Sequence, residues 1–488
     1  MNCDLLVIGA GGAGLAAAVT AAEAGASAII LDRLRVTGGA TVFAKGIFAV
    51  GSKFQKELGI DISADEAFLQ HMFYTHYLAN GRLVRSIIDK SADTIHWLDE
   101  RGTEFIKPAE LYPGAARTWH TMKREGKSIT KALEKTAKEL GVPIHFRTRA
   151  RKLIMKDGRV AGVVAEDKDG NKVEYTARTV VIASGGFANN EEMMEKYTQA
   201  GKHTIEMAFG QVGKEGDGVL MAWEAGAAKE GTSVIQRGLA GVMKKKEVLK
   251  EAPTKSQFDK HITAILKQPT LWVNANGERF FNESEFSFAH IGNAMSKQPG
   301  QVLFNMFDDD YRKYMEEQGI DVGLGVFAPK GTKIPCVVDA IQASIDKDEA
   351  WVCDSLEEMA EKAGMDYATL KENVDEYNMS CDKGHDDLFA KSPEYMKPVR
   401  RPPFYAIKGH PTHVGTLGGI KINHKTEVIR EDSETGLDVI PGLYAAGNVA
   451  GGMYGDTYDA SHTLGLTLAF ALNSGRIAGE SALKYMGK

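Results

Sequence analysis

The chain has 488 residues, of which 43% are hydrophobic and 25% are charged, and its formal net charge is -6 at pH 7. This composition is typical of a globular protein with a sizeable core, and it excludes a disordered or fibrous chain. The slightly acidic balance and the lack of long basic runs argue against nucleic acid as a partner.

The N-terminal residues predict neither secretion nor a membrane span. Asp4 stands where a signal peptide would be basic, and the uncharged residues 5–22 contain glycines that make a poor membrane helix. The 4 cysteines are scattered without CxxC or CxxCH spacing, which argues against a redox pair, an iron–sulfur cluster and haem attachment. We therefore expect a cytoplasmic protein without a membrane span.

Residues 3–33 form the first recognisable unit, with the sequence CDLLVIGAGGAGLAAAVTAAEAGASAIILDR. An apolar run, a glycine-rich turn, an alanine-rich helix and a second apolar run predict a β-α-β unit. Gly9 allows a tight turn, Gly11 lets the backbone approach a pyrophosphate, and Gly14 permits close packing of helix against strand. The helix N-terminus then faces the anion, and Asp32 is placed to bind a ribose hydroxyl. The unit predicts a dinucleotide site.

Two later segments favour FAD over NAD as the dinucleotide. The sequence GGAT at residues 38–41 would bring a second backbone loop against the nucleotide, which an NAD site does not need. Near the C-terminus, residues 439–456 read VIPGLYAAGNVAGGMYGD. This pattern predicts a short strand followed by Gly447 and Asn448. It resembles the segment with which two-dinucleotide-fold flavoproteins close the far end of the FAD.

In this order the three motifs resemble those of the fumarate reductase and succinate dehydrogenase flavoprotein superfamily. The segments ARTVVIASGGFANNEEMM, GKEGDGVLMAWEAGA, NANGERFFNES and SGRIAGESA resemble the same superfamily. The resemblance implies an α/β fold, with a two-dinucleotide-binding-type, glutathione-reductase-like FAD domain and an inserted α+β capping domain. We expect the FAD domain at residues 1–227 and 353–488 and the cap at residues 228–352. The loop at 38–46 has no histidine where covalent members attach FAD, so we expect non-covalent FAD.

The resemblance also implies which residues contact FAD. They lie in the glycine turn, in the second loop, in two central segments and around the start of the last helix. They are Gly9, Gly11, Ala13, Gly14, Asp32, Arg33, Gly39, Ala40, Thr41, Gly46, Ala150, Ser184, Gly185, Asp217, Gly447, Asn448, Thr463, Leu464, Thr467 and Leu468. We expect the last helix to begin at Thr463 and to direct its positive end at the flavin's pyrimidine edge.

The residues by which fumarate reductases hold a dicarboxylate are missing. The position of the proton-delivering arginine falls on Ser287, the two histidine positions fall on residues 414–415, and the substrate arginine position falls on Thr463. Anionic oxygens are best held by forked, charge-assisted donors, so we do not expect a fumarate or succinate site. An anion clamp of other residues stays open, and it would use Arg237, His410 or His413.

Aromatic and neutral residues would line the substrate side instead, which resembles the ketosteroid dehydrogenase branch of the superfamily. Tyr458 matches the tyrosine that one group of those enzymes carries ahead of the final helix. Its phenol could donate a hydrogen bond to an enone oxygen or a proton to the α-carbon, or its ring could merely pack on the FAD domain. The candidate catalytic residues are Tyr458, Tyr454 and Ser287, and the candidate substrate contacts are Phe286, His413 and His462.

We therefore expect an FAD-dependent oxidoreductase that reduces or desaturates a carbon–carbon bond adjacent to a carbonyl, by hydride transfer through flavin nitrogen 5. The substrate would be an enone, an enoate or a ketosteroid-like compound rather than fumarate or succinate. The expected partners are this small molecule and a separate electron donor or acceptor, with no nucleic acid and no metal. Two alternatives stay open: an amino-acid oxidase on the same fold, and a flavin-carrying electron-transfer subunit.

Overall fold

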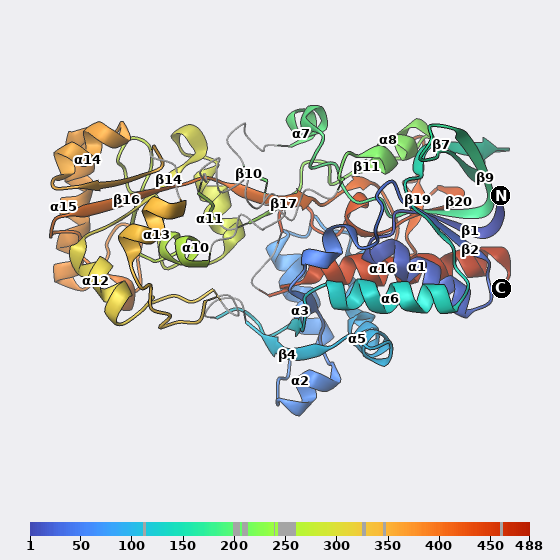
Figure 1. Cartoon of the computed structure of the whole chain (residues 1–488), viewed down its shortest axis with the longest axis horizontal. Coiled ribbons are helices and arrows are strands. Elements are labelled where there is room, and N and C mark those ends of the chain that lie inside the picture. The colour runs from blue at the N-terminus through green and yellow to red at the C-terminus, as the bar shows by residue number, and fades with distance from the viewer. Residues whose placement is uncertain are drawn as a thin grey trace.

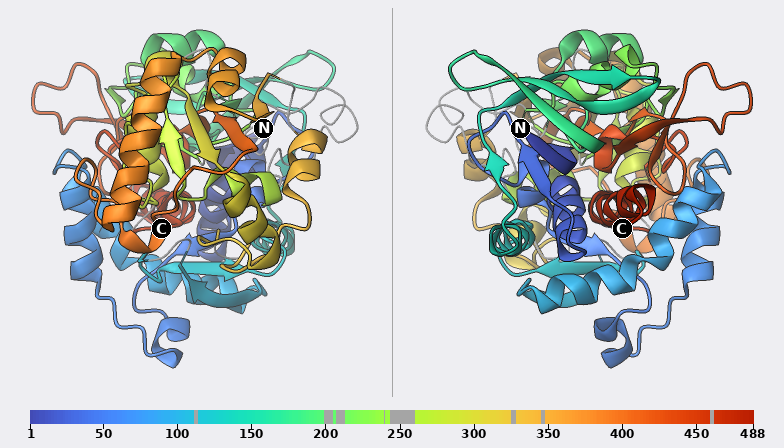
Figure 2. Two further views of the ribbon diagram at one scale, coloured as in Figure 1. Left: turned by 90° about the vertical axis from the view of Figure 1, so that its left-hand side faces the viewer. Right: turned by 90° about the vertical axis from the view of Figure 1, so that its right-hand side faces the viewer.

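The computed structural model describes residues 1–110, 114–198, 205–206, 213–238, 240–242, 260–324, 328–344, 348–458 and 462–488. The molecule is elongated, with a large sheet and both termini at one end and the helices α10 to α15 at the other (Figure 1). The right-hand view of Figure 2 faces the end with the termini. In the part of the chain so described, no helix is both long and apolar enough to cross a membrane.

An eight-stranded sheet forms the core of the end that carries the termini. Its order is β19-β20-β9-β1-β2-β6, and the hairpin β7-β8 joins it at β9. The strands are β1 (Asn2–Ile8), β2 (Ala28–Leu31), β6 (Ile144–His145), β7 (Arg149–Lys156), β8 (Arg159–Glu166), β9 (Lys172–Ile182), β19 (Glu427–Ile429) and β20 (Val439–Ala445). The central strands pair in parallel and are buried, which is why they read as continuous apolar runs. Both ends of the chain thus build one sheet.

Three long helices pack together beside this sheet (Figure 1). They are α1 (Gly12–Glu23), α6 (Lys127–Glu139) and α16 (Leu466–Met486). A Cβ on Gly475 of α16 would lie 2.2 Å from the backbone oxygen of Ala13, so glycine there allows α16 to cross α1 closely. The last helix begins at Leu466 and not at the predicted Thr463, because Gly465 adopts a left-handed conformation with φ of 85° and ends the preceding loop.

Smaller elements complete what we call the large-sheet unit, which comprises the eight-stranded sheet, α1 to α8, α16 and a three-stranded sheet of β3, β4 and β5. These elements are β3 (Gly46–Phe48), α2 (Lys53–Glu57), α3 (Ala64–Tyr74), α4 (Gly81–Asp89), α5 (Ser91–Glu100), β4 (Phe105–Ala109), β5 (Trp119–Met122), α7 (Glu191–Tyr197) and α8 (Asp217–Glu224). The backbone N–H of Phe48 in β3 donates to the oxygen of Gly465 at 3.1 Å. This bond fixes the start of α16.

A four-stranded antiparallel sheet forms the core of the other end, which we call the small-sheet unit. Its strands, in the order β13-β14-β16-β15, are β13 (Leu271–Val273), β14 (Leu303–Phe307), β16 (Phe404–Gly409) and β15 (Ala350–Cys353). Its helices are α10 (Lys260–Leu266), α11 (Phe288–Met295), α12 (Asp309–Glu317), α13 (Val337–Ser344), α14 (Leu356–Ala363) and α15 (Tyr367–Lys383). In β14, Phe307 packs with α10 to α13, whereas Met306 packs with α14 and α15. Alternate residues therefore face two helix layers.

The small-sheet unit extends beyond the predicted boundary at residue 352. Strand β15 pairs with β16 along residues 350–353, and helices α14 and α15 share an apolar cluster with β13 and β14. The pairing joins segments about fifty residues apart, so local sequence patterns do not reveal it. We propose that the inserted unit continues to Gly409, where β16 ends.

Short strands link the two units in both directions along the chain. One small sheet contains β10 (Ile205–Glu206), β17 (Thr412–Thr416) and β12 (Ile235–Arg237), and another contains β11 (Lys229–Glu230) and β18 (Gly419–Ile420). In Figure 1, β10 and β17 lie between the two units. Residues at the ends of these strands are therefore placed to reach a site between the units.

Candidate active site

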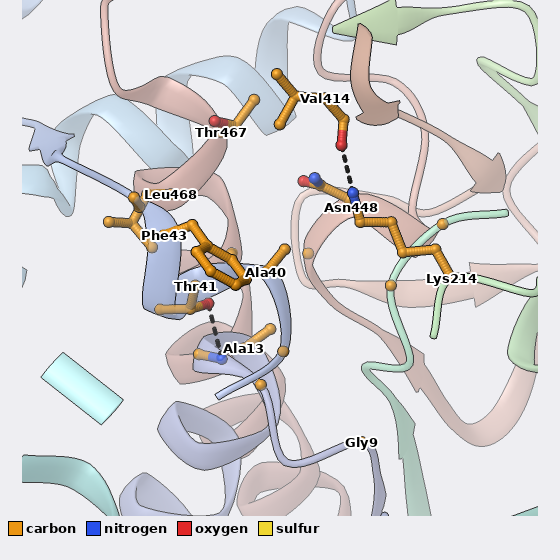
Figure 3. A pocket seen from close by; sticks show the side chains of 18 of the residues that line it. Gly9, Ala13, Ala40, Thr41, Phe43, Lys214, Val414, Asn448, Thr467 and Leu468 are labelled. Atoms are coloured by element: carbon orange, nitrogen blue, oxygen red, sulfur yellow. Dashed lines mark hydrogen bonds between the residues drawn. The ribbon is translucent and has the colours of Figure 1, made fainter. Parts of the chain in front are cut away.

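A cavity of about 610 Å³ is lined by residues of both units. Figure 3 labels lining residues from the large-sheet unit and from β17. The large-sheet unit contributes the turn after β1, the loop from Gly39 to Gly46, the turn after β9 and the start of α16. Residues 236–238, Phe288 and Leu324 line it from the linking strands and the small-sheet unit. A cavity built from segments so far apart in sequence is a typical location for a cofactor and substrate site.

The glycine turn after β1 has the geometry that the sequence predicts. Gly9 has a φ of 109°, and a Cβ there would lie 2.5 Å from the oxygen of Ala183, so only glycine fits between β1 and β9. A Cβ on Gly11 would meet nothing closer than 3.9 Å, which leaves this backbone open towards the cavity. The N–H of Gly12 donates to Thr41 Oγ1 at 3.1 Å and ties the second loop to the start of α1 (Figure 3). A helix N-terminus that borders the cavity is suited to bind an anion.

Asp32 lies at the end of β2 and lines the same cavity. Its carboxylate accepts hydrogen bonds from the N–H groups of Ala10 and Leu34, both at 2.7 Å. Burial raises the pKa of Asp32, against the lowering effect of these two bonds. The two bonds orient the carboxylate and leave acceptor capacity for a further hydroxyl group.

The charged residues next to Asp32 are paired with one another. Arg149 donates to both carboxylate oxygens of Asp217, at 2.8 and 2.6 Å, and Arg33 lies 2.6 Å from Glu215. These ion pairs join β7, α8 and the loop after β2. Asp217, one of the predicted FAD contacts, therefore lines the cavity as the partner of an arginine.

In the part of the chain that the structure describes, two buried polar atoms of the cavity wall have no hydrogen-bond partner. They are Ser184 Oγ in the turn after β9 and Asn448 Oδ1 after β20. Buried polar groups are nearly always satisfied in native proteins, so an unpaired one at a cavity indicates a missing ligand. Together with the open helix N-terminus and the oriented Asp32, these atoms fit a large polar cofactor such as FAD.

The predicted FAD contacts gather around this cavity with two exceptions, Gly14 and Thr463. Gly14 packs on the strand side of α1, where a Cβ would lie 1.9 Å from the oxygen of Gly9. Thr463 is fully buried, and its hydroxyl lies 3.4 Å from His71 Nδ1. The structure therefore places Gly14 in helix packing and Thr463 behind the cavity wall.

The three predicted catalytic residues do not all line the cavity. Tyr458 lines the cavity and is 5% exposed. Tyr454 lies behind it, with ring centres 5.6 Å apart, and packs edge-on against Phe470 of α16. Ser287 precedes α11 at the N-cap position, is buried and does not line the cavity, and its Oγ has no partner within the described ranges. Only Tyr458 is positioned to contact a bound molecule directly.

None of the three predicted substrate contacts lines the cavity. Phe286 packs edge-on against Tyr395, with ring centres 5.4 Å apart. His413 is buried in β17, where desolvation and then the positive charges of Lys214 and Arg237 lower its pKa to about 4. The backbone oxygen of His462 accepts a hydrogen bond from the Thr118 hydroxyl at 3.2 Å.

Other residues occupy the places that these three were expected to fill. Phe288, Leu324 and Arg237 border the cavity on the side of the small-sheet unit, and Lys214 borders it from the segment before α8. The Lys214 ammonium donates to the backbone oxygen of Val414 (Figure 3). The aromatic pattern around residues 286–288 and the isolated Arg237 were the available signals in the sequence. Among the residues whose positions are described, no group of His, Cys, Asp or Glu side chains could hold a metal ion.

Comparison with known proteins agrees with this geometry. A family model described as an FAD binding domain matches residues 4–461. The chain is 34% identical to a vinyl phenol reductase of Lactiplantibacillus plantarum, over 99% of this chain and 96% of that protein. It is 28% identical to a urocanate reductase of Eggerthella lenta, over 99% of this chain and 74% of that protein.

The fold is also similar to a solved flavoprotein structure. The 3-ketosteroid-Δ4-(5α)-dehydrogenase of Rhodococcus jostii RHA1 superposes with a TM-score of 0.76 at 25% identity, over 99% of this chain and 96% of that one. The predicted resemblance and the predicted cofactor are thus confirmed. The chain belongs to the FAD binding domain family, within the fumarate reductase and succinate dehydrogenase flavoprotein superfamily, and it is an FAD-dependent oxidoreductase.

Proposed function

We propose that this enzyme reduces the carbon–carbon double bond of a small planar compound in which that bond is conjugated with an aromatic ring or a carbonyl group. This proposal rests mainly on one observation: Phe288 and Leu324 of the small-sheet unit and Tyr458 of the segment before α16 line the cavity with apolar and aromatic surface. Flat aromatic side chains favour flat conjugated ligands. The similarity to a vinyl phenol reductase along nearly the whole chain supports the same substrate class.

We also propose a division of labour between the two units. The large-sheet unit is the two-dinucleotide-binding-type FAD domain, because the glycine turn, Asp32 and the start of α16 all belong to it. The small-sheet unit is the cap, which contributes Phe288 and Leu324 to the other side of the cavity. Such a cap excludes water from the reacting double bond.

Residues of this chain would hold FAD along the cavity. The N-terminus of α1 would bind the pyrophosphate, Asp32 a ribose hydroxyl, and the N-terminus of α16 the pyrimidine edge of the flavin. The bound cofactor supplies hydride transfer at its nitrogen 5. Neither histidine nor cysteine is among the described residues that line the cavity, which supports non-covalent binding.

Tyr458 is the proposed proton donor. Reduction of a double bond requires a proton as well as a hydride, and Tyr458 is the predicted catalytic residue whose side chain borders the cavity. Tyr454 packs against its ring, and Phe470 in turn packs edge-on against Tyr454. A phenol that is buried and held in one orientation can deliver its proton to one carbon of a bound alkene, an effect worth about 10² to 10⁴ in rate.

The test is reduction of the protein-bound FAD without oxygen, followed by addition of hydroxystyrenes, enones and enoates. We expect rapid reoxidation by at least one of these alkenes and no effect of their saturated analogues. Tyr458→Phe should retain FAD and slow reoxidation about a hundredfold or more, whereas Tyr454→Phe, which alters the neighbouring ring, should change it little. Equal rates in Tyr458→Phe and the wild type would assign Tyr458 to packing. Failure of every alkene would refute the proposed activity.

A further inference from the structure

Arg237 lines the cavity, and the FAD site described above does not account for its position. It ends β12, opposite His413 of β17. Its side chain passes Gly292 of α11, where a Cβ would lie 2.5 Å from Arg237 Cδ. A glycine at this helical position therefore leaves a path for the arginine side chain towards the cavity.

The guanidinium of Arg237 has no counter-charge within the part of the chain that the structure describes. Burial lowers the pKa of Arg237, and no carboxylate opposes this effect. The other two arginines that line the cavity differ, since Arg33 pairs with Glu215 and Arg149 with Asp217. Because a guanidinium stays charged throughout the physiological range, a partly buried and unpaired one favours an anion beside it.

The pyrophosphate of FAD is not the anion that this position suits. The open helix N-terminus of α1 and the loop 39–41 border the cavity from the large-sheet unit. Arg237 packs against Gly292 of α11 in the small-sheet unit. The two anion-binding features therefore belong to different walls of the cavity.

The surroundings of Arg237 favour a single planar anion. Lys214 adds a second positive charge near His413, which itself stays neutral because its pKa is about 4. Phe288 and Leu324 add apolar surface to the same wall. A dicarboxylate such as fumarate would need charged donors at both of its ends. This wall instead offers positive charge at Arg237 and apolar surface at Phe288 and Leu324.

We propose that Arg237 binds an oxyanion of the substrate, a phenolate or carboxylate group conjugated with the double bond. The proposal rests on the proposed function and specifies its substrate class: aryl alkenes with one ionised oxygen. Arg237 would fix the distance between this oxygen and the reacting carbons, so that the double bond lies at the reacting end of the cavity. The guanidinium also stabilises negative charge that spreads onto the oxygen during reduction.

Binding to the oxidised, FAD-loaded protein tests this inference without turnover. The probes are 4-nitrophenol, which is yellow only when ionised, 3-phenylpropionate as a carboxylate, and 4-nitroanisole as the uncharged counterpart. Calorimetry gives the affinity, and absorbance gives the ionisation state of bound 4-nitrophenol. We expect Arg237→Met to weaken binding of at least one anionic probe about tenfold to a hundredfold and to leave 4-nitroanisole binding unchanged.

Two further variants separate charge from general damage. Arg237→Lys keeps a positive charge but lacks the planar donors of a guanidinium. It should bind the anionic probes more tightly than Arg237→Met and less tightly than the wild type. Arg151→Met removes an exposed arginine of β7, outside the cavity, and should bind all probes as the wild type does. Loss of 4-nitrophenolate binding alone would identify a phenolate subsite, and loss of 3-phenylpropionate binding alone a carboxylate subsite.

Three results would overturn the inference. One is unchanged affinity of Arg237→Met for both anions, and another is an equal loss for 4-nitroanisole. The third is a shifted flavin reduction potential with unchanged anion binding, which would place Arg237 against the cofactor. Arg237-dependent anion binding in a protein that reduces no alkene would instead refute the proposed function and leave this inference standing.

Discussion

Replacing Lys267 with methionine should stabilise the protein at neutral and acidic pH. Lys267 follows α10 and is buried, with 3% of its surface exposed. Its ammonium nitrogen has no hydrogen-bond partner among the residues with described positions, and it lies 4.4 Å from the ring centre of Phe288. Burial lowers the pKa of Lys267 from 10.5 to about 7, although the charge of Glu285 opposes this change.

The size and pH dependence of the effect follow from this pKa. Since a tenfold change in an equilibrium constant is worth about 1.4 kcal/mol, protonated Lys267 costs the folded state up to roughly 5 kcal/mol. Between the two pKa values the unfolded chain holds a proton that the folded protein lacks, so stability rises with pH. The penalty is therefore complete below about pH 7 and disappears as the pH approaches 10.5.

Urea unfolding of the FAD-loaded wild type and Lys267→Met, at about pH 6 and about pH 10, measures this difference. We expect the variant to have the higher unfolding free energy at the lower pH, by several kcal/mol, and nearly the same value at the higher pH. Lys391→Met is the matched control, because Lys391 is also buried but donates to Thr270 O at 2.7 Å and Tyr377 Oη at 2.8 Å. That variant should destabilise the protein.

Two outcomes would refute the reasoning about Lys267. Destabilisation by Lys267→Met at both pH values would mean that its ammonium makes favourable interactions in the folded protein. Stabilisation of equal size at both pH values would mean that packing of the methionine, and not removal of a buried charge, causes the effect.

Two further substitutions test the small-sheet unit and the cofactor turn. Arg279→Met should destabilise the protein by about 3 to 5 kcal/mol in urea unfolding, because it leaves the buried carboxylates of Glu283 and Asp386 without their forked partner. Arg279→Lys should recover little of the lost unfolding free energy. Full recovery would show that a single positive charge suffices and that the paired N–H donors of the guanidinium are not needed. Gly14→Ala should lower the FAD content of the purified protein, because its Cβ would lie 1.9 Å from a backbone oxygen of the turn. Gly81→Ala, whose Cβ would meet nothing closer than 3.8 Å, should keep its FAD.

The cofactor side of the cavity could be predicted from sequence because backbone geometry defines it. Gly9 requires a positive φ and a close approach to β9, which is a constraint that a glycine reveals directly. Asp32 ends a buried strand, so its side chain must lie at the carboxyl edge of the sheet. Such positions depend on a few neighbouring residues, and the glycine motif includes those residues.

The substrate side could not be predicted as well, because long-range packing decides which side chain faces the cavity. Phe286 and Phe288 are two residues apart, yet one packs on Tyr395 and the other lines the cavity. The start of α11 at Phe288 turns successive side chains in different directions, and the sequence does not fix that rotation. The same limit applies to the extent of the small-sheet unit, which includes the pairing of β15 with β16.

The residues that line the cavity are divided between two walls, and the two walls can change independently of each other. The residues that fit FAD lie on the large-sheet unit, whereas Arg237 and Phe288 lie with the small-sheet unit and the linking strands. Changes on the second wall can alter which conjugated molecule is bound without disturbing the glycine turn or α16. Tyr458, on the segment before α16, belongs to the first wall. Tyr458, the proposed proton donor, can therefore keep its relation to the start of α16 while residues of the small-sheet unit and the linking strands change.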